Sequence, residues 1–306
     1  MTKVVNVAQV PQRSPFRYPG GKTWLIPVVR QWLQAKAGQD RDLVEPYAGG
    51  GIITLTAVAE KLVRNAVMAE IDEDVAAVWQ TIIEDETGGE WLIKQISNFE
   101  MNIENLKAIL SQEIISTRQR AFITILKNRV NHGGILAPGA GILKHGELGK
   151  GICSRWYPNT LNRRIMEIAF IKHRITFYQR DAMQVMDENS DRKDAVYFID
   201  PPYTVAGRRL YKHSSIDHEK LFDIADKLAG DFLITYDNAD EIRNLAIKYG
   251  FDRENILMKS THHIKKYELL IGRNLDWIRE DKISSQKSKR LPGTRFVQQT
   301  IVDPCL

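Results

Sequence analysis

Short apolar runs alternate with helical patterns along most of this chain. The alternation occurs first from about residue 42 to residue 84 and again from about residue 175 into the 270s. Such alternation is typical of a doubly wound α/β sheet, in which helices that follow the strands cover both faces. The strands that the pattern predicts are residues 43–45, 66–70, 175–178, 196–200, 232–236, 256–259 and 267–271.

The last two of these strands lie close together in the sequence. Too few residues separate 256–259 from 267–271 for a helical crossover. Parallel neighbours need such a crossover, whereas antiparallel neighbours need only a short turn. We therefore expect strand 267–271 to be antiparallel to its neighbour.

The alternation is interrupted between the acidic stretch at residues 84–90 and residue 175. Within this interval, residues 98–115 and 117–130 have helical patterns, and the glycine-rich residues 131–156 are expected to form a loop or hairpin. The predicted organisation is one domain formed by residues 1–84 and 175–280, an inserted, mainly helical subdomain at residues 85–174, and a polar, basic tail at residues 281–306.

The charge distribution indicates a polyanionic partner for the insertion. The net charge is +5, but the segment from Arg118 to Arg180 holds twelve Lys or Arg against two acids, so it carries +10 and the remainder −5. Such a block suits contacts to phosphates, with an affinity that falls as salt rises. The candidate contacts, chosen only from their place in this block, are Arg129, Asn131 and Arg155.

Cysteine content and hydropathy indicate the compartment. The 306 residues include two cysteines, Cys153 and Cys305, which provide no disulfide framework and suit a reducing environment. No apolar stretch approaches the length of a membrane span, and the first ten residues lack the apolar core of a signal peptide. We expect a cytoplasmic protein.

Asp200, Pro201, Pro202 and Tyr203 follow directly after the apolar run at residues 195–199. The exocyclic amine of a nucleobase is a poor nucleophile, because its lone pair is delocalised into the ring. Two acceptors on its N–H bonds would draw the lone pair back: the carboxylate of Asp200 and a carbonyl of the Pro201–Pro202 backbone. Tyr203 adds a flat face for stacking. These four residues predict methylation of a nucleobase amino group; the alternative is a plain Pro-Pro turn after a buried strand.

A second motif indicates the methyl donor. Residues 45–51 read Glu-Pro-Tyr-Ala-Gly-Gly-Gly, and position 54 is Thr where a dinucleotide-binding motif would have glycine. Glu70, at the end of the next expected strand, can accept hydrogen bonds from the hydroxyls of a ribose. S-adenosylmethionine has a ribose, no pyrophosphate and a transferable methyl group. Asp181 is expected either to accept a hydrogen bond from its adenine or to cap a helix.

Residues 20–23, Gly-Gly-Lys-Thr, look like the end of a phosphate-binding loop. That interpretation fails, because Phe16 stands where the loop needs glycine and no strand precedes it. We expect Tyr18 and Lys22 to lie against the methionine end of the cofactor, with the ammonium group near its carboxylate.

In this order and spacing the motifs resemble those of the Dam-like (D12 class) DNA adenine-N6 methyltransferases, over roughly residues 14–275. The resemblance implies a Rossmann-like methyltransferase sheet, S-adenosylmethionine as cofactor, and transfer to N6 of an adenine flipped out of duplex DNA. Three mild departures are Tyr18 in place of a common tryptophan, Glu70 in place of the usual aspartate, and the sequence of the glycine turn. Residues 128–156 do not align with the hairpin that reads GATC, so the recognition sequence does not carry over.

The motifs and the resemblance together define the expected site. The expected catalytic residues are Asp200, Pro201, Pro202 and Tyr203. The expected cofactor-binding residues are Tyr18, Gly21, Lys22, Glu45, Pro46, Tyr47, Gly49, Gly51, Glu70, Ile71, Asp181, Ala182 and Asp200. Whether a cognate restriction endonuclease accompanies the enzyme, and whether it is a monomer or a dimer, stays open.

Several alternatives compete with this hypothesis. N4-cytosine methylation poses the same electronic problem, although Ser more often stands at position 200 in such enzymes; relatives that methylate RNA or protein glutamine more often have Asn there. A DNA-binding regulator without turnover would be expected to lack a motif residue, and none is missing. A metal enzyme would need ligands beyond His213, His218, His262 and His263, so no metal is expected.

Overall fold

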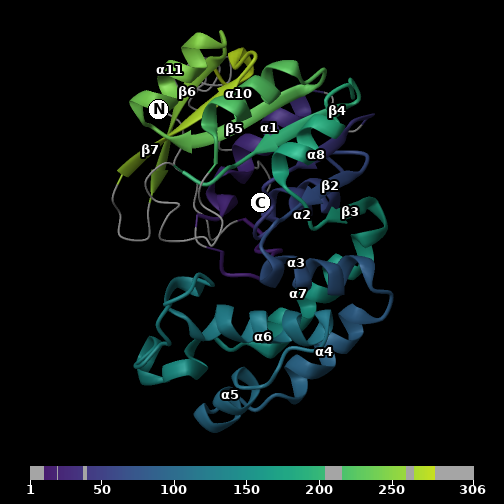
Figure 1. Cartoon of the computed structure of the whole chain (residues 1–306), viewed down its shortest axis with the longest axis vertical. Coiled ribbons are helices and arrows are strands. Elements are labelled where there is room, and N and C mark those ends of the chain that lie inside the picture. The colour runs from purple at the N-terminus through teal and green to yellow at the C-terminus, as the bar shows by residue number, and fades with distance from the viewer. Residues whose placement is uncertain (1–9, 19, 37–39, 204–215, 260–264, 280–306) are drawn as a thin grey trace, which may run out of the picture.

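The computed structural model describes residues 10–18, 20–36, 40–203, 216–259 and 265–279. Its centre is a seven-stranded sheet with the strand order β3-β2-β1-β4-β5-β7-β6 (Figure 1). The expected α/β fold is confirmed, and each predicted strand is present. The strands are β1 (Asp42–Glu45), β2 (Ala66–Ala69), β3 (Ile175–Tyr178), β4 (Ala195–Ile199), β5 (Asp231–Asp237), β6 (Asp252–Lys259) and β7 (Lys265–Gly272).

Strands β1 to β5 are parallel, and β7 is antiparallel to both β5 and β6. The predicted antiparallel direction of the last strand is therefore confirmed. Because β1 lies between β2 and β4, the chain moves outwards from β1 in one direction and later in the other. Open α/β sheets bind ligands at the carboxyl edge of such a switch point. The loops after β1 and β4 meet there.

Helices cover both faces of the sheet. In β4 every residue is buried, with Val196 and Phe198 in one apolar cluster and Tyr197 and Ile199 in the other. This division follows from the alternation of side chains along a strand and explains why the run is apolar without interruption. The flanking helices are α1 (Ile26–Ala35), α2 (Ile52–Ala59), α8 (Ala182–Glu188), α10 (His218–Lys227) and α11 (Asp240–Lys248), whereas α3 (Glu73–Trp79) lies below the sheet and packs mainly against α6 (Thr117–Val130) (Figure 1).

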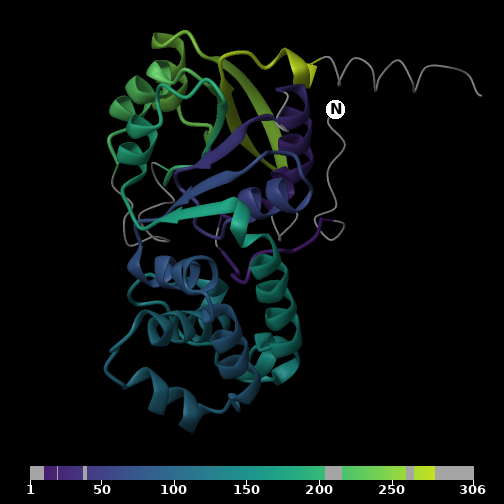
Figure 2. The same ribbon diagram turned by 90° about the vertical axis from the view of Figure 1, so that its right-hand side faces the viewer.

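A second group of helices lies below the sheet in Figures 1 and 2. Its members are α4 (Gly88–Asn98), α5 (Ile103–Leu110), α6 (Thr117–Val130) and α7 (Pro158–Ile171). All four fall within the proposed insertion, residues 85–174, and the loop at residues 131–156 contains only short 3-10 turns and one isolated bridge. In the described part of the chain, no helix is long and apolar enough to cross a membrane.

The helix predicted at residues 117–130 is present with those bounds, whereas the one predicted at 98–115 is wrong in extent. Asn102 accepts a hydrogen bond from the backbone N–H of Asn105 and so begins a new, short helix. Ser116 accepts from the N–H of Gln119, whose side chain accepts from the N–H of Ile115. This reciprocal cap starts α6 and separates it from α5.

Candidate active site

The glycine turn between β1 and α2 packs too closely for any side chain. Gly49 and Gly51 have φ values of +47° and +63°, in the left-handed region that favours glycine. A Cβ atom at Gly49 would lie 2.6 Å from the Tyr18 ring, and one at Gly51 would lie 2.8 Å from the methyl group of Met68. The Trp79 indole donates to the Gly49 carbonyl over 2.9 Å. All three glycines of the turn are buried, so their lack of a side chain lets Tyr18, Met68 and Trp79 pack directly against the backbone between β1 and α2.

Two buried or partly buried glutamates hold this turn. Glu45 is 3% exposed, and its carboxylate accepts the N–H of Thr54 in the first turn of α2 over 2.9 Å. Glu70 follows β2 and accepts the N–H groups of Gly49 over 3.0 Å and of Asp72 over 2.9 Å. Burial raises the pKa of Glu45 to about 8 and that of Glu70 to about 7. Both carboxyl groups thus stay protonated to higher pH than usual.

The loop after β4 brings Asp200 to the same edge. Its Oδ1 accepts a hydrogen bond from the Thr235 hydroxyl over 2.6 Å and lies 3.1 Å from the Lys22 ammonium nitrogen. Lys22 is 4% exposed, and it also donates to the Gly20 carbonyl over 3.2 Å. Burial lowers the pKa of Lys22, but the charges of Asp200 and Glu268 outweigh burial and raise it overall. This lysine is therefore a buried cation.

Tyr203 completes this group of residues. Its hydroxyl donates to Glu268 over 2.8 Å, and the Lys22 ammonium lies 4.8 Å from the centre of its ring. Pro201 is buried and Pro202 is half-buried. Burial raises the pKa of the Tyr203 hydroxyl well above its ordinary value, so this group stays a donor.

The structure thus brings the N-terminal motif, the glycine turn and the Asp-Pro-Pro-Tyr loop to one edge of the sheet. Tyr18 covers Gly49 and Gly50, and its carbonyl accepts the N–H of Gly21 over 3.1 Å. We expected the Lys22 ammonium to be available for a cofactor carboxylate, but here it pairs with acidic side chains of the protein.

Asp181 and its neighbours lie at the start of α8. Asp181 accepts the N–H groups of Met183 and Gln184 through one oxygen, so the helix-capping alternative is present in the structure. Burial, and to a smaller extent the charge of Asp181, raise the pKa of Tyr47. Ala182 is buried, whereas Ile71 after Glu70 is 43% exposed. A large aliphatic side chain that is exposed beside Glu70 offers a surface for a planar ring.

Sequence reasoning missed two members of the site, Thr235 and Glu268. Thr235 lies in β5 and Glu268 in β7, on strands whose place beside β4 is set only by tertiary folding. One feature of the sequence could have indicated Glu268: it is the single acid in the run Tyr-Glu-Leu-Leu-Ile at residues 267–271.

The three candidate DNA contacts differ in exposure. Arg129 is 5% exposed and donates to the carbonyl of Pro15, and burial lowers its pKa to about 9. Its side chain therefore holds the N-terminal segment and does not lie on the surface, which corrects the expected phosphate contact. Asn131 is 9% exposed and donates to the Ile135 carbonyl, whereas Arg155 is half-buried.

Many other basic side chains of the insertion make internal contacts. Arg118 pairs with Asp85, and Arg120 pairs with Asp74. Lys144, Lys150 and Arg163 are exposed. The basic surface is therefore smaller than the count of charges indicates, and it lies around residues 144–163.

The N-terminal segment links the insertion to the glycine turn (Figure 2). The Asn128 side chain accepts the N–H of Arg17 over 2.8 Å and donates to the carbonyls of Arg17 and Gly134. Arg164 donates to the carbonyl of Ser14 over 2.9 Å. Side chains from α6 and α7 thus hold the residues immediately before Tyr18.

The histidines form no metal site in the described residues. His218 lies 2.7 Å from the Tyr236 hydroxyl through its Nδ1. His213, His262 and His263 lie outside the described residues.

One family model matches part of the chain. Residues 18–132 match the model of the family described as D12 class N6 adenine-specific DNA methyltransferase. The matched range includes Tyr18, Lys22, the glycine turn and Glu70, and it ends before Asp181 and Asp200. No curated protein matches the chain by sequence.

Three solved structures are similar to the chain over most of its length. A candidate RNA methyltransferase of Pyrococcus horikoshii has 9% identity and a TM-score of 0.38, covering 89% of this chain and 92% of that one. The precorrin-6Y C5,15-methyltransferase of Geobacter metallireducens has 12% identity and a TM-score of 0.34, with 80% and 87% covered. The tRNA methyltransferase TrmK of B. subtilis has 10% identity and a TM-score of 0.34, with 88% of each chain covered.

Proposed function

We propose that this chain, whose residues 18–132 match the model of the D12 class family, transfers the methyl group of S-adenosylmethionine to N6 of an adenine in duplex DNA. The observation that carries this proposal is the convergence of three motifs at the switch point of the sheet. Lys22 contacts both Asp200 and the Tyr203 ring there, beside the loop that contains Gly49 and Gly51.

The residues at this edge fit the proposed cofactor. Gly49 and Gly51 give the turn its tight left-handed backbone, and Glu70 places a carboxyl group where a ribose would need an acceptor. Each oxygen of Glu70 accepts one backbone N–H, and a carboxylate oxygen can accept further hydrogen bonds. We assign Ile71 and Ala182 to the adenine ring, Asp181 to its amino group, and the turn at residues 45–51 to the rest of the ligand.

The proposed chemistry depends on a fixed carboxylate. Among the described residues, the contacts to Asp200 from Thr235 and Lys22 are both made by Oδ1, so Oδ2 is the oxygen that we assign to an N6 hydrogen. The Pro201 carbonyl is assigned to the other N6 hydrogen. The cofactor supplies an electrophilic methyl group, and the new C–N bond forms as the S–C bond breaks and leaves its electron pair on sulfur.

Orientation and electrostatics would supply most of the catalysis. As N6 gains the methyl group it would become positive, and the fixed Asp200 carboxylate would stabilise this charge until the N6 proton passes to water. We assign the base to stacking on Tyr203, whose ring also packs against Tyr236 with the ring centres 5.9 Å apart. Extruding the base costs a few kcal/mol, which stacking and the two hydrogen bonds must offset.

We place the DNA on the exposed basic residues Lys144, Lys150 and Arg163. If Lys144 and Lys150 contact phosphates, replacing both with Gln should weaken DNA binding and lower the slope of log K against log salt by about 0.9 per contact. Arg118→Gln is the matched control, because that side chain pairs with Asp85. An unchanged slope in the double variant would move the DNA to another surface.

The experiment that tests the reaction uses mixed-sequence duplex DNA and S-adenosylmethionine, followed by digestion to nucleosides and mass spectrometry. We expect N6-methyladenine from the native protein and none from Asp200→Ala. N4-methylcytosine would retain the mechanism and change the base. A product on RNA alone, or no product on either nucleic acid, would overturn the proposed substrate.

A further inference from the structure

Glu268 is the single acidic residue of β7 and directly precedes the apolar run Leu269–Ile271. It lies within β7, opposite Asp237 of β5 and Ile256 of β6, and it is 7% exposed. The next residues, Leu269 to Ile271, are buried at 2% exposure or less. A carboxylate in such a place is costly unless it is paired and hydrogen-bonded.

The partners of Glu268 belong to the proposed catalytic machinery. Its Oε2 accepts the Tyr203 hydroxyl over 2.8 Å and lies 3.6 Å from the Lys22 ammonium nitrogen. Lys22 in turn lies 3.1 Å from Asp200. One oxygen of Glu268 therefore contacts both the tyrosine of the Asp-Pro-Pro-Tyr loop and the cation that holds its aspartate.

These contacts limit how the loop can move. The Tyr203 hydroxyl is at the far end of its side chain, so fixing it determines the tilt of the ring that would receive the base. The ammonium of Lys22 lies between two carboxylates, and removing one of them would let it shift toward the other. Asp200 would then lose its present alignment with Thr235.

We propose that Glu268 is a positioning residue for methyl transfer, which fixes the Tyr203 ring through its hydroxyl and fixes Asp200 through Lys22. This inference rests on the proposed function of the site. In this proposal Glu268 acts on the reacting atoms only through Tyr203 and, by way of Lys22, through Asp200.

Burial and the charge of Lys22 act in opposite directions on the pKa of Glu268. It raises the pKa of Glu268, while the charge of Lys22 opposes that rise. The group of Lys22, Asp200 and Glu268 has a net charge of −1 when all three are ionised. A cationic methyl donor would neutralise this charge.

The test compares Glu268→Ala, Glu268→Gln and Tyr203→Phe in the full-length protein. The Gln variant keeps an acceptor for the Tyr203 hydroxyl but loses the charge that faces Lys22. Misplacement of reacting groups by about 1 Å can lower the rate by about 100-fold, so we expect a fall of this order in kcat for the Ala variant. The Gln variant should fall between the Ala variant and the native protein, and the KM for the cofactor should change by only a few fold.

A double-mutant cycle separates positioning from a general loss of stability. If Glu268 acts through Tyr203, adding Tyr203→Phe to Glu268→Ala should lower kcat by less than Tyr203→Phe does alone. Independent effects that multiply, or native kcat in Glu268→Ala, would overturn the inference. Should Glu268→Ala fail to fold, the cycle is run with Glu268→Gln, to which the same criteria apply.

A readout that needs no turnover distinguishes failure of this inference from failure of the proposed function. A buried ammonium held by carboxylates exchanges its protons slowly, so ¹H–¹⁵N spectra of lysine-labelled protein should contain a Lys22 signal that is assigned by its loss in Lys22→Met. We expect Glu268→Gln to weaken or remove this signal. Its persistence unchanged would contradict the inference, whereas absence of methylation by the native protein would contradict the proposed function alone.

Discussion

The acidic residues at the two edges of the central sheet differ in how many cationic partners they have. At the amino edge, Asp42 lies 2.9 Å from Arg64 and 2.5 Å from Arg192, and Asp194 lies 2.5 Å from Arg64. Burial alone would raise the pKa of Asp42, but hydrogen bonds from the two arginines lower it. Hydrogen bonds from Arg192 and Arg64 lower the pKa of Asp194 to about 2. The acids of this edge are neutralised within the protein.

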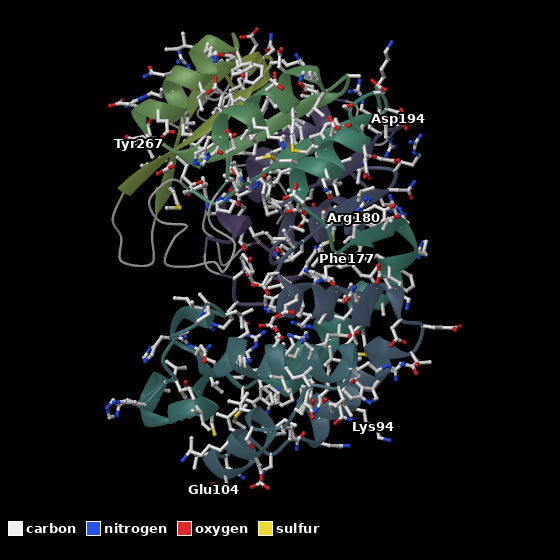
Figure 3. All side chains as sticks on the ribbon, viewed as in Figure 1. Lys94, Glu104, Phe177, Arg180, Asp194 and Tyr267 are labelled. Carbon is white, nitrogen blue, oxygen red and sulfur yellow. The ribbon has the colours of Figure 1, made fainter. Side chains whose placement is uncertain are left out.

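At the carboxyl edge the acids have fewer cationic partners. No ion pair joins Glu45 or Glu70 to a cation in the described ranges, and Lys22 is shared between Asp200 and Glu268. Burial raises the pKa of Glu45, Glu70 and Glu268. Figure 3 locates the two edges, with Asp194 just before β4 and Tyr267 next to Glu268 in β7.

This contrast indicates which edge is built for a ligand. A polar cavity of about 460 Å³ lies beside β2 and β3 and is lined by Asp42, Arg174 and Arg192, among others. The arginines that line this cavity already have partners within the protein: Arg174 donates to backbone carbonyls that include that of Val58, and Arg192 pairs with Asp42. A site for a cationic methyl donor needs excess negative charge, which at the carboxyl edge comes from Asp200 and Glu268 sharing the single cation Lys22.

The largest expected effect is the difference in kcat between two variants that each neutralise one acid, one variant at each edge. Asp200→Asn keeps the shape of the side chain and removes the charge, so we expect kcat to fall by at least about 100-fold, as when a preorganised electrostatic contact is lost. Asp194→Asn removes an exposed, arginine-paired charge and should leave kcat unchanged. Steady-state methylation assays on both variants check the contrast, and equal losses in both would break it.

The edges should also respond oppositely to pH. The pKa of Glu45 is about 8 in the folded protein, above its unfolded value, so the folded state keeps a proton that the unfolded state loses. The free energy of unfolding should therefore fall as pH rises from about 5 to 8, and Glu45→Gln should reduce that fall by an amount of order 3 kcal/mol. Urea unfolding of the ligand-free protein across this range measures it.

Asp42→Asn is the counterpart at the amino edge. The pKa of Asp42 is lowered by folding, so its contribution is present above about pH 4 and is lost as pH falls through the folded value. In the variant, the free energy of unfolding should change less with pH below pH 4. From pH 5 to 8 it should be lower by a constant amount, so that its slope with pH is unaltered. If Glu45→Gln and Asp42→Asn changed the same part of the curve, the two edges would not differ as described.

A smaller effect tests the packing of the glycine turn. Gly51→Ala meets both a positive φ and a contact of 2.8 Å with Met68, whereas Gly250→Ala has a φ of +67° and open space around it. The positive φ should lower the free energy of unfolding by about 1–2 kcal/mol in each variant. Gly51→Ala should lower it further than Gly250→Ala, because only Gly51 has a close contact. Chemical unfolding and calorimetric cofactor affinity measure the two. Equal stabilities with native affinity would show that the turn has room.

Local patterns in the sequence were sufficient to predict the strands and the motifs at their ends. The apolar run at residues 195–199 and Asp200 are consecutive in the sequence, and so are residues 45–51, so each motif can be identified without knowledge of the fold. Thr235 and Glu268 were missed because their contacts with Asp200 and Tyr203 depend on the order of strands in the sheet.

Arg129 shows a different kind of error, because its signal was present. Phe122, Ile125, Leu126 and Val130 are buried on α6, and Arg129 lies one turn after Ile125 on the same face. A charged residue on the apolar stripe of a helix is expected to lie inside, where it needs a partner. The carbonyl of Pro15, distant in the sequence, supplies that partner.

Hydrogen–deuterium exchange of the native protein with and without S-adenosylmethionine tests the central contrast most directly. We expect slower exchange at residues 45–54, 70–75 and 181–185, and no change at residues 40–43, 64–66 and 191–195. Protection at the amino edge, or no protection at either edge despite binding shown by calorimetry, would contradict the assignment of the carboxyl edge as the cofactor site.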